Sequence, residues 1–547
     1  MSARRSQPYT FSPEGLSDAL SGTHVFPGAC TKLQNLIPDP TTKNLWICRP
    51  AAVKLTSFAG FTTPGFISCF KVIGTKVFGM IATGRNAGHD EPFCFDLVAG
   101  TFITVSGVTS ANTPLSPATS GAWTPPQIAV MGKYVIVTHP GFAGGAGAYF
   151  GWFDVGNPAA PAWSAGNTTG VTLPYVPQGV AVFNGRAWFV INPSVLTALI
   201  PSTYTTDAYS LNIGSTPVTQ ILTYDDNLPI TALAGLGLFN QNGGVVQSLM
   251  VFKDTVNIYQ VTGDFATGYT ISRNSLNTAT ATLSPTGITS TPEGLTFIAP
   301  DGLRILDYYA KIQHPIGIAG EGVNAPFIYS LTPTRVVAAC NASLLRVSVQ
   351  NASRAGTPWE EYWYDLTRKV WSGPHTFVPS AIDTYRQTFI VAPQGITGSL
   401  WQSDVVPSIT TTYVENGAQL QWDWWTTIFP DSGQMAVYNF QETTINMALD
   451  ANMISYTVSI INPQNTVYDT ISNTVTGATP TWDVSVWDAA VWDGLSSGLT
   501  PRRVNWTKPN ITSRAQMRIQ GSSAAGVKLG DIKFNVEGVP YVPPTGL

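Results

Sequence analysis

Charged side chains are scarce in this chain of 547 residues. Asp, Glu, Lys and Arg make up 11% of it, whereas an ordinary soluble domain has roughly 25%. Solubility usually depends on surface charge. A surface with so few charged side chains is therefore either covered in an assembly or kept soluble by the neutral polar groups of Thr, Ser, Asn and Gly. Composition alone leaves both interpretations open.

The chain also lacks a basic footprint. Its formal net charge is −4, and its runs of cations are no longer than pairs such as Arg4-Arg5 and Arg502-Arg503. Proteins that read nucleic-acid sequence usually carry clustered cations, so we expect no sequence-specific recognition. A protein that lets DNA slide past would itself need few cations.

Cysteine is rare, and targeting signals are not visible. The chain has no CxxC motif, which predicts reduced, mostly buried thiols rather than a disulfide framework. The N-terminal sequence MSARRSQPYTFSPEG has no apolar core of a signal peptide. No run approaches the ~18 apolar residues of a transmembrane helix. We therefore expect the chain to be made in a cytoplasm. The five cysteines are Cys30, Cys48, Cys69, Cys94 and Cys340.

Signatures of catalysis are missing as well. The sequence contains no GxSxG, HExxH or P-loop motif, and its five histidines are scattered. We therefore predict that the chain is not an enzyme and has no catalytic residue, metal or cofactor.

Three acidic groups are weak candidates for chemistry. Asp90 and Glu91, in the polar segment 85–91, could bind a cation, although a solvated loop is the alternative. The segment 225–227 is a similar turn. Glu360-Glu361 and Asp423 lie beside many aromatics, as glycosidase carboxylates often do.

Strand and turn signals dominate what is present. Valine, threonine, isoleucine and aromatic residues form runs that 50 glycines and 40 prolines interrupt. Between residues 59 and 405, hairpin turns recur every 40 to 69 residues, close to the roughly 40–50 residues of one propeller blade. This spacing predicts a β-propeller, with a large sandwich of unrelated hairpins as the alternative. The turns lie at or near Gly74, Gly132, Asn184-Gly185, Lys253-Asp254, Glu293-Gly294, Asn341 and Arg386.

A second pattern accompanies the hairpins. Phe95-Asp96-Leu97, Phe153-Asp154-Val155 and Tyr364-Asp365-Leu366 are each followed by a further aromatic residue. An aromatic-Asp-aliphatic strand end predicts a tight turn started by the Asp carboxylate. The aromatic rings are expected to pack between neighbouring blades.

The two ends of the chain differ from the middle. Residues 1–58 are rich in proline and predict an extended N-terminal arm, and residues 59–405 predict the propeller. Residues 406–547 predict a smaller C-terminal β-rich domain that resembles a β-sandwich. The fold class predicted for the whole chain is all-β.

Three Trp-Asp pairs stand close together in the C-terminal part, beginning at Trp482, Trp487 and Trp492. A Trp-Asp pair marks one propeller family, but there it recurs about every 40–45 residues, not every five. These tryptophans are either core residues or an aromatic contact patch for a partner subunit or a sugar.

Several segments resemble a known family. Residues 33–50, with LQNLIPDP and NLWICRP, look like the opening of structural proteins of short-tailed bacteriophages. Residues 251–306, from VFKDTVNIYQVTG to PDGLRIL, resemble the centre of their tail nozzle or hub proteins, also called packaged-DNA stabilisation proteins. Residues 502–529 are similar in layout to the last strands of that family. In order and arrangement the resemblance covers most of the chain.

This resemblance implies a β-propeller protein that forms a six-fold ring, a homohexamer, in the virion tail after assembly in the host cytoplasm. Such a nozzle lines and closes the DNA channel, retains the packaged genome and opens for DNA ejection. The implied partners are other copies of the chain, the tail adaptor protein below the portal, tail fibres or spikes, and the host cell envelope. DNA would pass without sequence-specific binding.

A gate of this kind would use loops that meet on the ring axis, and residues 106–126 and 141–172 are candidates. Two other functions remain open: a carbohydrate-binding or carbohydrate-cleaving propeller, and a tail spike or adhesin. Oligomer symmetry separates them, because a nozzle is six-fold, a spike is three-fold and a lectin is expected to be a monomer.

Overall fold

The structure is a computed structural model of the chain. It describes residues 6–16, 28–58, 65–83, 88–116, 125–142, 148–166, 176–192, 195–198, 222–223, 228–239, 244–264, 268–272, 281–282, 284–313, 315–316, 333–351, 359–394, 396, 398–404, 413–429, 437–449, 454–461, 466–475, 500–512, 515–523 and 526–539. Within these ranges nearly every regular element is a strand, and the helical elements are two single 3-10 turns, η1 (Ser110–Asn112) and η2 (Pro285–Gly287). None of the described helices is long and apolar enough to cross a membrane.

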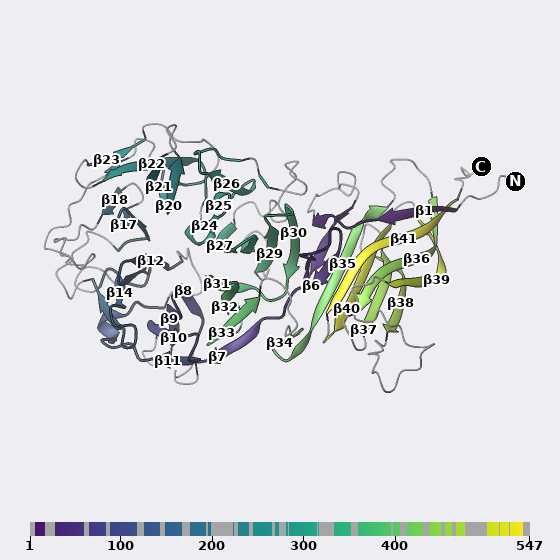
Figure 1. Ribbon diagram of the computed structural model, residues 1–547, viewed down its shortest axis with the longest axis horizontal. Coiled ribbons are helices and arrows are strands. Elements are labelled where there is room, and N and C mark those ends of the chain that lie inside the picture. Colours follow the sequence, from purple (N-terminus) through teal and green to yellow (C-terminus); the bar gives the residue numbers. More distant parts are fainter. Residues whose placement is uncertain are drawn as a thin grey trace, which may run out of the picture.

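In the described part of the chain, seven antiparallel sheets follow one another around a common centre (Figure 1). Each sheet begins with its innermost strand, and the next strands of the sheet lie successively further out. The first four blades are β8 (Ile67–Ile73), β9 (Lys76–Thr83), β10 (His89–Asp96) and β11 (Thr101–Ile103); β12 (Gln127–Met131), β13 (Tyr134–Thr138), β14 (Gly151–Asp154) and β15 (Ala162–Ala165); β16 (Gly179–Phe183), β17 (Arg186–Asn192), β18 (Val195–Ala198) and β19 (Leu222–Thr223); and β20 (Ile230–Phe239), β21 (Val245–Lys253), β22 (Asn257–Asp264) and β23 (Gly268–Ile271).

The remaining three blades complete the propeller. The fifth has three described strands, and the sixth continues beyond its last strand into the C-terminal domain. They are β24 (Thr289–Thr291), β25 (Gly294–Ala299) and β26 (Gly302–Asp307); β27 (Pro333–Asn341), β28 (Leu344–Asn351), β29 (Glu360–Asp365) and β30 (Val370–His375); and β31 (Pro379–Tyr385), β32 (Thr388–Pro393) and β33 (Ser399–Asp404). The all-β class and the propeller-like core are thus confirmed.

The last blade takes its outermost strand from the beginning of the chain. β7 (Val53–Ser57) pairs antiparallel with β33, in register from Ser399 opposite Ser57 to Gln402 opposite Val53. The segment predicted as an extended arm therefore closes the ring of blades. A strand from one end of the chain thereby holds the last blade in place beside the first.

Apolar side chains fill the spaces between neighbouring blades. Phe78 of the first blade and Phe153 of the second lie 5.4 Å apart between ring centroids. Phe252 of the fourth and Phe297 of the fifth lie 5.3 Å apart. The predicted packing of aromatic rings between blades is therefore correct, and each blade buries both of its faces.

The hairpin turns are confirmed by the backbone, although they do not all occupy the same position in a blade. Gly74, Asn184 and Arg386 each have a positive φ at a turn between the first two strands of a blade. Asp254, with φ 52°, instead joins the second and third strands of the fourth blade. The first hairpin of the fourth blade joins β20 to β21 instead. The turn at Asp254 therefore comes later in its blade than the other turns, which explains the irregular spacing in the sequence.

The Asp-started turns also form. Asp96 Oδ1 accepts hydrogen bonds from the backbone N–H groups of Val98 and Ala99, at 2.9 and 3.1 Å. The carboxylates of Asp154 and Asp365 cap the turns after β14 and β29 in the same way. A hydrogen bond from Lys76 Nζ to Asp96 Oδ2, at 2.7 Å, together with these backbone bonds lowers the pKa of the carboxyl to about 2.

The C-terminal domain consists of two sheets that face each other across one core. Ile445, Leu529 and Phe534 of one sheet and Trp424 and Ile519 of the other are all buried in that core. The strands of the domain are β34 (Val414–Glu415), β35 (Ala418–Phe429), β36 (Val437–Leu449), β37 (Ile454–Ile461), β38 (Val467–Val475), β39 (Thr500–Thr512), β40 (Ala515–Ser523) and β41 (Val527–Val539).

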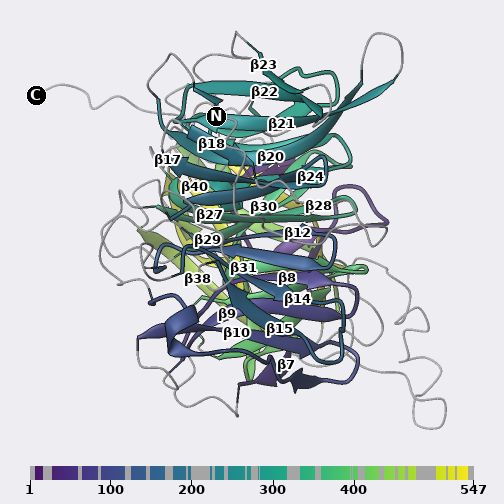
Figure 2. The same ribbon diagram turned by 90° about the vertical axis from the view of Figure 1, so that its left-hand side faces the viewer.

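The N-terminal strands run between the two parts of the molecule. One of them pairs with the last strand, β41, at the end remote from the propeller, and another pairs with both β30 and β35 (Figure 1). Seen from the propeller edge, the C-terminal strands lie behind the blades (Figure 2). These strands are β1 (Ser6–Phe11), β2 (Gly15–Leu16), β3 (Ala29–Cys30), β4 (Lys32–Gln34), β5 (Leu36–Pro38) and β6 (Trp46–Cys48).

The seam between the last and first blades offers a test of the closure. Phe58 directly follows β7, is buried, and lies 5.1 Å from Phe93 and 4.4 Å from Phe102 between ring centroids. We expect Phe58→Ala to lower the free energy of unfolding by about 3–5 kcal/mol, because it leaves a cavity in this seam. Phe66→Ala is the matched control, since Phe66 is 45% exposed. Equal urea midpoints for the two variants would contradict this closure.

Candidate functional site: the propeller channel and the domain junction

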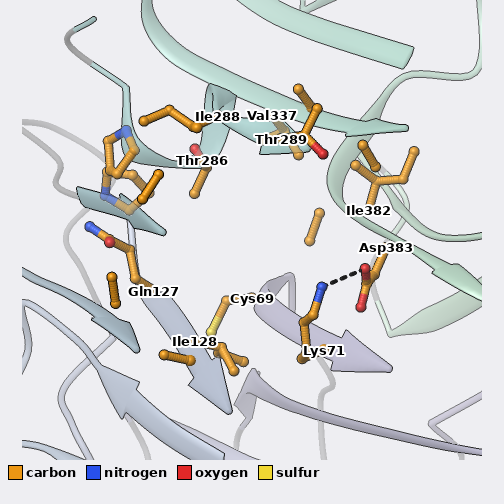
Figure 3. Close-up of a pocket in the computed structure, with 18 of the residues that line it drawn as sticks. Cys69, Lys71, Gln127, Ile128, Thr286, Ile288, Thr289, Val337, Ile382 and Asp383 are labelled. Atoms are coloured by element: carbon orange, nitrogen blue, oxygen red, sulfur yellow. Dashed lines mark hydrogen bonds and ion pairs between the residues drawn. The ribbon is translucent and has the colours of Figure 1, made fainter. Parts of the chain in front are cut away.

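The innermost strands of the blades surround a cavity of about 560 Å³ on the propeller axis. Its lining is dominated by small or aliphatic side chains, such as Ala129, Ala234 and Ala339. Figure 3 shows Gln127, Thr286 and Thr289 as polar groups of this lining. The channel of one propeller is therefore a small, mostly neutral chamber.

Lys71 and Asp383 are the charged residues among those that line the cavity. Lys71 Nζ lies 2.8 Å from Asp383 Oδ1 (Figure 3). The backbone N–H of Val72 donates to Asp383 Oδ2 at 2.7 Å. Lys71 comes from β8 and Asp383 from β31, so the pair joins the first and last blades inside the channel. The Asp383 carboxylate is largely buried by this contact, whereas the Lys71 side chain stays 45% exposed.

The thiols of the channel are poor nucleophiles. Burial, with a smaller effect of the Asp90 charge, raises the pKa of Cys69 far above its usual value. Burial likewise raises the pKa of Cys340 to about 11. Because the thiolate is the reactive form, neither group is suited to covalent catalysis at neutral pH.

A buried polar network joins the arm, the propeller and the C-terminal domain. Arg49 is almost fully buried and makes a bidentate ion pair with Glu415, at 2.8 Å from Nη1 and 2.7 Å from Nη2. Glu415 Oε1 also accepts a hydrogen bond from the backbone N–H of Ala52 at 2.9 Å. Planar pairing of this kind fixes orientation as well as distance.

Asn35 is the centre of this network. Its φ of +57° lies in the left-handed region that asparagine tolerates. Its Oδ1 accepts from Arg49 Nε at 2.9 Å, its backbone N–H donates to His375 Nδ1 at 3.1 Å, and its Nδ2 donates to the carbonyl of Gln421 at 2.6 Å. One arm residue thus bonds to blade six and to β35 together.

A second buried ion pair lies in blade six. Arg346 Nη2 is 2.6 Å from Glu361 Oε1, and both side chains are almost completely buried. The guanidinium lies over the ring of Trp363, 4.6 Å from its centroid. Burial raises the pKa of Glu361 and lowers the pKa of Arg346, so desolvation outweighs their attraction.

The structure corrects the interpretation of Asp90 and Glu91. We considered a solvated loop or a cation site, but both residues lie in β10 and are 1% exposed. Asp90 Oδ2 is 3.0 Å from His139 Nε2, and Asp90 Oδ1 accepts from Ser116 Oγ at 2.5 Å. Within the described residues no cluster of three His, Cys, Asp or Glu side chains could hold a metal ion.

The glycosidase-like carboxylates are not arranged as a free pair. Glu361 is neutralised by Arg346, and Glu360 accepts a hydrogen bond from the Tyr362 hydroxyl at 2.9 Å. Asp423 belongs to the C-terminal domain, where it forms ion pairs with the side chains of Lys32 and Arg518.

Other predicted sites lie partly or wholly outside the described residues. Trp482, Trp487 and Trp492 are outside them, as is the segment 225–227. Of the two candidate gate segments, only 106–116, 125–126, 141–142 and 148–166 are described. The interpretation of these tryptophans as core or contact patch stays a prediction.

Sequence reasoning missed Asn35, Arg49 and Glu415. Arg49 and Glu415 are 366 residues apart, and no local pattern links them. One signal was available: an arginine in an apolar segment, ICRPAA, requires a partner if it is buried.

No protein-family model and no curated protein matches the chain. Similar solved structures include the Dos1 propeller, at 10% identity and a TM-score of 0.32 over 70% of this chain and 95% of that one. AofleA from Arthrobotrys oligospora has 13% identity and a TM-score of 0.31 over 66% and 92%. An exo-β-1,3-galactanase from Phanerochaete chrysosporium has 9% and 0.25 over 79% and 99%. These similarities concern the β-propeller-like fold alone and say nothing of function.

The junction should be sensitive to loss of one charge. Glu415→Gln leaves Arg49 buried without its counter-ion, so we expect the free energy of unfolding to fall by about 3–5 kcal/mol. The control is Glu442→Gln, because Glu442 pairs with Arg503, whose side chain is 79% exposed, at 3.4 Å. An exposed pair should contribute less than about 1 kcal/mol. Similar losses in urea denaturation of both variants would contradict the role of the junction.

His375 predicts a pH dependence. Burial, and then the charges of Arg49 and Arg346, hold its pKa well below the ordinary 6.5. The unfolded chain therefore binds a proton below pH 6.5 that the folded chain does not. Stability from this group is present above 6.5 and decreases as pH falls, by about 1.4 kcal/mol per pH unit.

His375→Gln should lack that part of the slope. Urea unfolding at pH values between 5 and 6.5 measures the difference between the variant and the parent. Parallel pH profiles would show that His375 is not held neutral in the folded state.

Proposed function

We propose that the chain is a structural component of a short-tailed phage tail, a ring-forming nozzle that retains the packaged genome and opens for DNA ejection. The observation that carries the proposal is the resemblance of residues 33–50, 251–306 and 502–529 to that family. In the structure, these three segments contribute strands to the arm, to blades four and five, and to the C-terminal domain.

The rigid connection between the two parts supports a mechanical role. The arm is hydrogen-bonded to both the propeller and the C-terminal domain, and the junction between them contains a buried bidentate ion pair. A ring that contains pressure needs subunits of fixed shape. The buried carboxylates Glu361 and Asp423 are paired with cations, which also suits a structural part.

Exposed apolar side chains support assembly. Phe239 and Val245 face each other across the β20–β21 hairpin and are 45% and 57% exposed. Tyr309, 69% exposed, lies 5.7 Å from Phe239 between ring centroids. Neighbouring exposed apolar groups often mark contact surfaces, and a chain with 11% charged residues has little charge to keep them soluble.

In this proposal DNA passes between subunits rather than through a propeller. The axial cavity of about 560 Å³ has the size of a small-molecule pocket, and a duplex cannot enter it. The DNA channel would therefore be the central hole of the ring. Copies of the chain, the tail adaptor, fibres or spikes and the host envelope are the proposed partners.

Electron microscopy of the purified chain tests this function. We expect six-fold rings with a central hole, formed by the chain alone or after addition of the tail adaptor protein. After treatment with nuclease, rings of six should carry no bound nucleic acid, because the proposed channel lets DNA pass without binding it. A chain that stays monomeric in both conditions, or forms trimers, would overturn the proposal in favour of a lectin or a spike.

A further inference from the structure

One face of the C-terminal domain is a grid of polar side chains. It spans five neighbouring strands in the order β4-β35-β40-β37-β38, of which β35, β40, β37 and β38 are labelled in Figure 1. Side chains alternate between the two faces of a strand. Leu33, Trp424, Ile519 and Val458 lie on the opposite face, in the core.

The register places the polar residues in rows that cross the strands. One row is Gln34, Asp423, Gln520, Thr457 and Ser472, in which each residue is paired with the next. Neighbouring strands are about 4.8 Å apart, so the row presents a hydrogen-bonding group at this interval.

A cavity of about 600 Å³ lies over these rows. It is lined by residues of all five strands, including Lys32, Gln34, Asp423, Thr457 and Gln520. The side-chain amides of Gln34 and Gln520 make no hydrogen bond to another described residue. Thr457 Oγ1 is buried and also has no partner among the described residues. The site therefore holds amides and a hydroxyl whose hydrogen-bonding capacity is not used.

Asp423 gives the cavity a fixed centre. Lys32 Nζ lies 2.8 Å from Asp423 Oδ2, and Arg518 Nε and Nη2 donate to its two oxygens at 2.9 and 3.0 Å. Trp425 Nε1 donates to Oδ1 at 2.9 Å. Both oxygens of the Asp423 carboxylate already accept hydrogen bonds, whereas Lys32 and Arg518 have further N–H groups that can donate to a ligand. The local charge is +1, and rigid donors surround it.

We infer that this face, the polar sheet face, binds an oligosaccharide. A sugar chain presents alternating hydroxyl donors and acceptors on each ring, and one ring advances by a distance similar to the strand spacing. Amide, hydroxyl and paired-charge groups can bind such hydroxyls in the same way along a row. The excess cation favours sugars that carry a carboxylate or phosphate.

A protein partner suits this face less well. The centre of a protein interface is usually apolar and depleted of charge, whereas here the centre is Asp423 with two cations. Trp425 supplies an aromatic ring, but Arg518 lies over it, 5.1 Å from its centroid. The inference concerns the C-terminal domain alone and does not depend on ring formation.

The test is a glycan array of neutral and acidic bacterial oligosaccharides probed with the full-length chain, followed by calorimetric titration of the best binder. We expect Gln520→Ala and Gln34→Ala each to weaken binding at least tenfold, with unchanged melting temperatures. Gln247→Ala in the propeller is the matched control and should bind like the parent.

Two results would overturn the inference: no array signal confirmed by titration up to millimolar glycan, or binding that both Gln34→Ala and Gln520→Ala leave unchanged. The second would assign the sugar to another part of the chain. Either result would leave the ring unaffected, because ring symmetry is measured separately by microscopy. Stronger binding of acidic than of neutral glycans, lost in Arg518→Gln, would support the role given to the excess charge.

Discussion

The fold depends on the pairing of β7 with β33. Each blade of the propeller buries both faces against its neighbours, so an open ring would leave one apolar face of the first blade and one of the last in water. The core between these blades contains Phe58, Phe93 and Leu400. Lys71 and Asp383 join the same two blades on the axis. Because the closing strand comes from the N-terminal arm, the arm cannot leave the propeller without opening it.

The same arm decides how the C-terminal domain is held. Along the arm, the chain forms β4, β5 and β6, passes Arg49 and then forms β7. β4 lies between β30 of the propeller and β35 of the C-terminal domain. Two buried charges at this point would be costly if either stood alone. Paired in bidentate geometry, they require Glu415, Ala52 and Asn35 to be in place together, which makes the junction specific.

Turns formed by residues close together in the chain could be predicted from the sequence, and contacts between residues far apart in the chain could not. The hairpins at Gly74 and Asn184 and the turn at Asp96 depend on residues within a few positions of one another. The hairpin at Asp254 forms where it was predicted, but its place between the second and third strands of the blade was not readable, because a positive-φ turn looks the same in either position. Asp90 was read as a loop residue, since nothing nearby shows that His139 would bury it. The polar sheet face needs the register of five strands, which no single segment contains.

The buried charges change the meaning of the low charge content. Arg49, Arg346, Glu361, Asp90 and Asp423 are all nearly inaccessible, so part of the 11% of charged residues does not reach the outer surface. Of these, Arg49 pairs with Glu415 where the arm, the propeller and the C-terminal domain join. In the proposed ring, this excludes a hinge between propeller and C-terminal domain, because moving one against the other would separate Arg49 from Glu415 in a dry environment. Opening would have to come from loops at the ring axis or from rotation of whole subunits, which can change without exposing the junction.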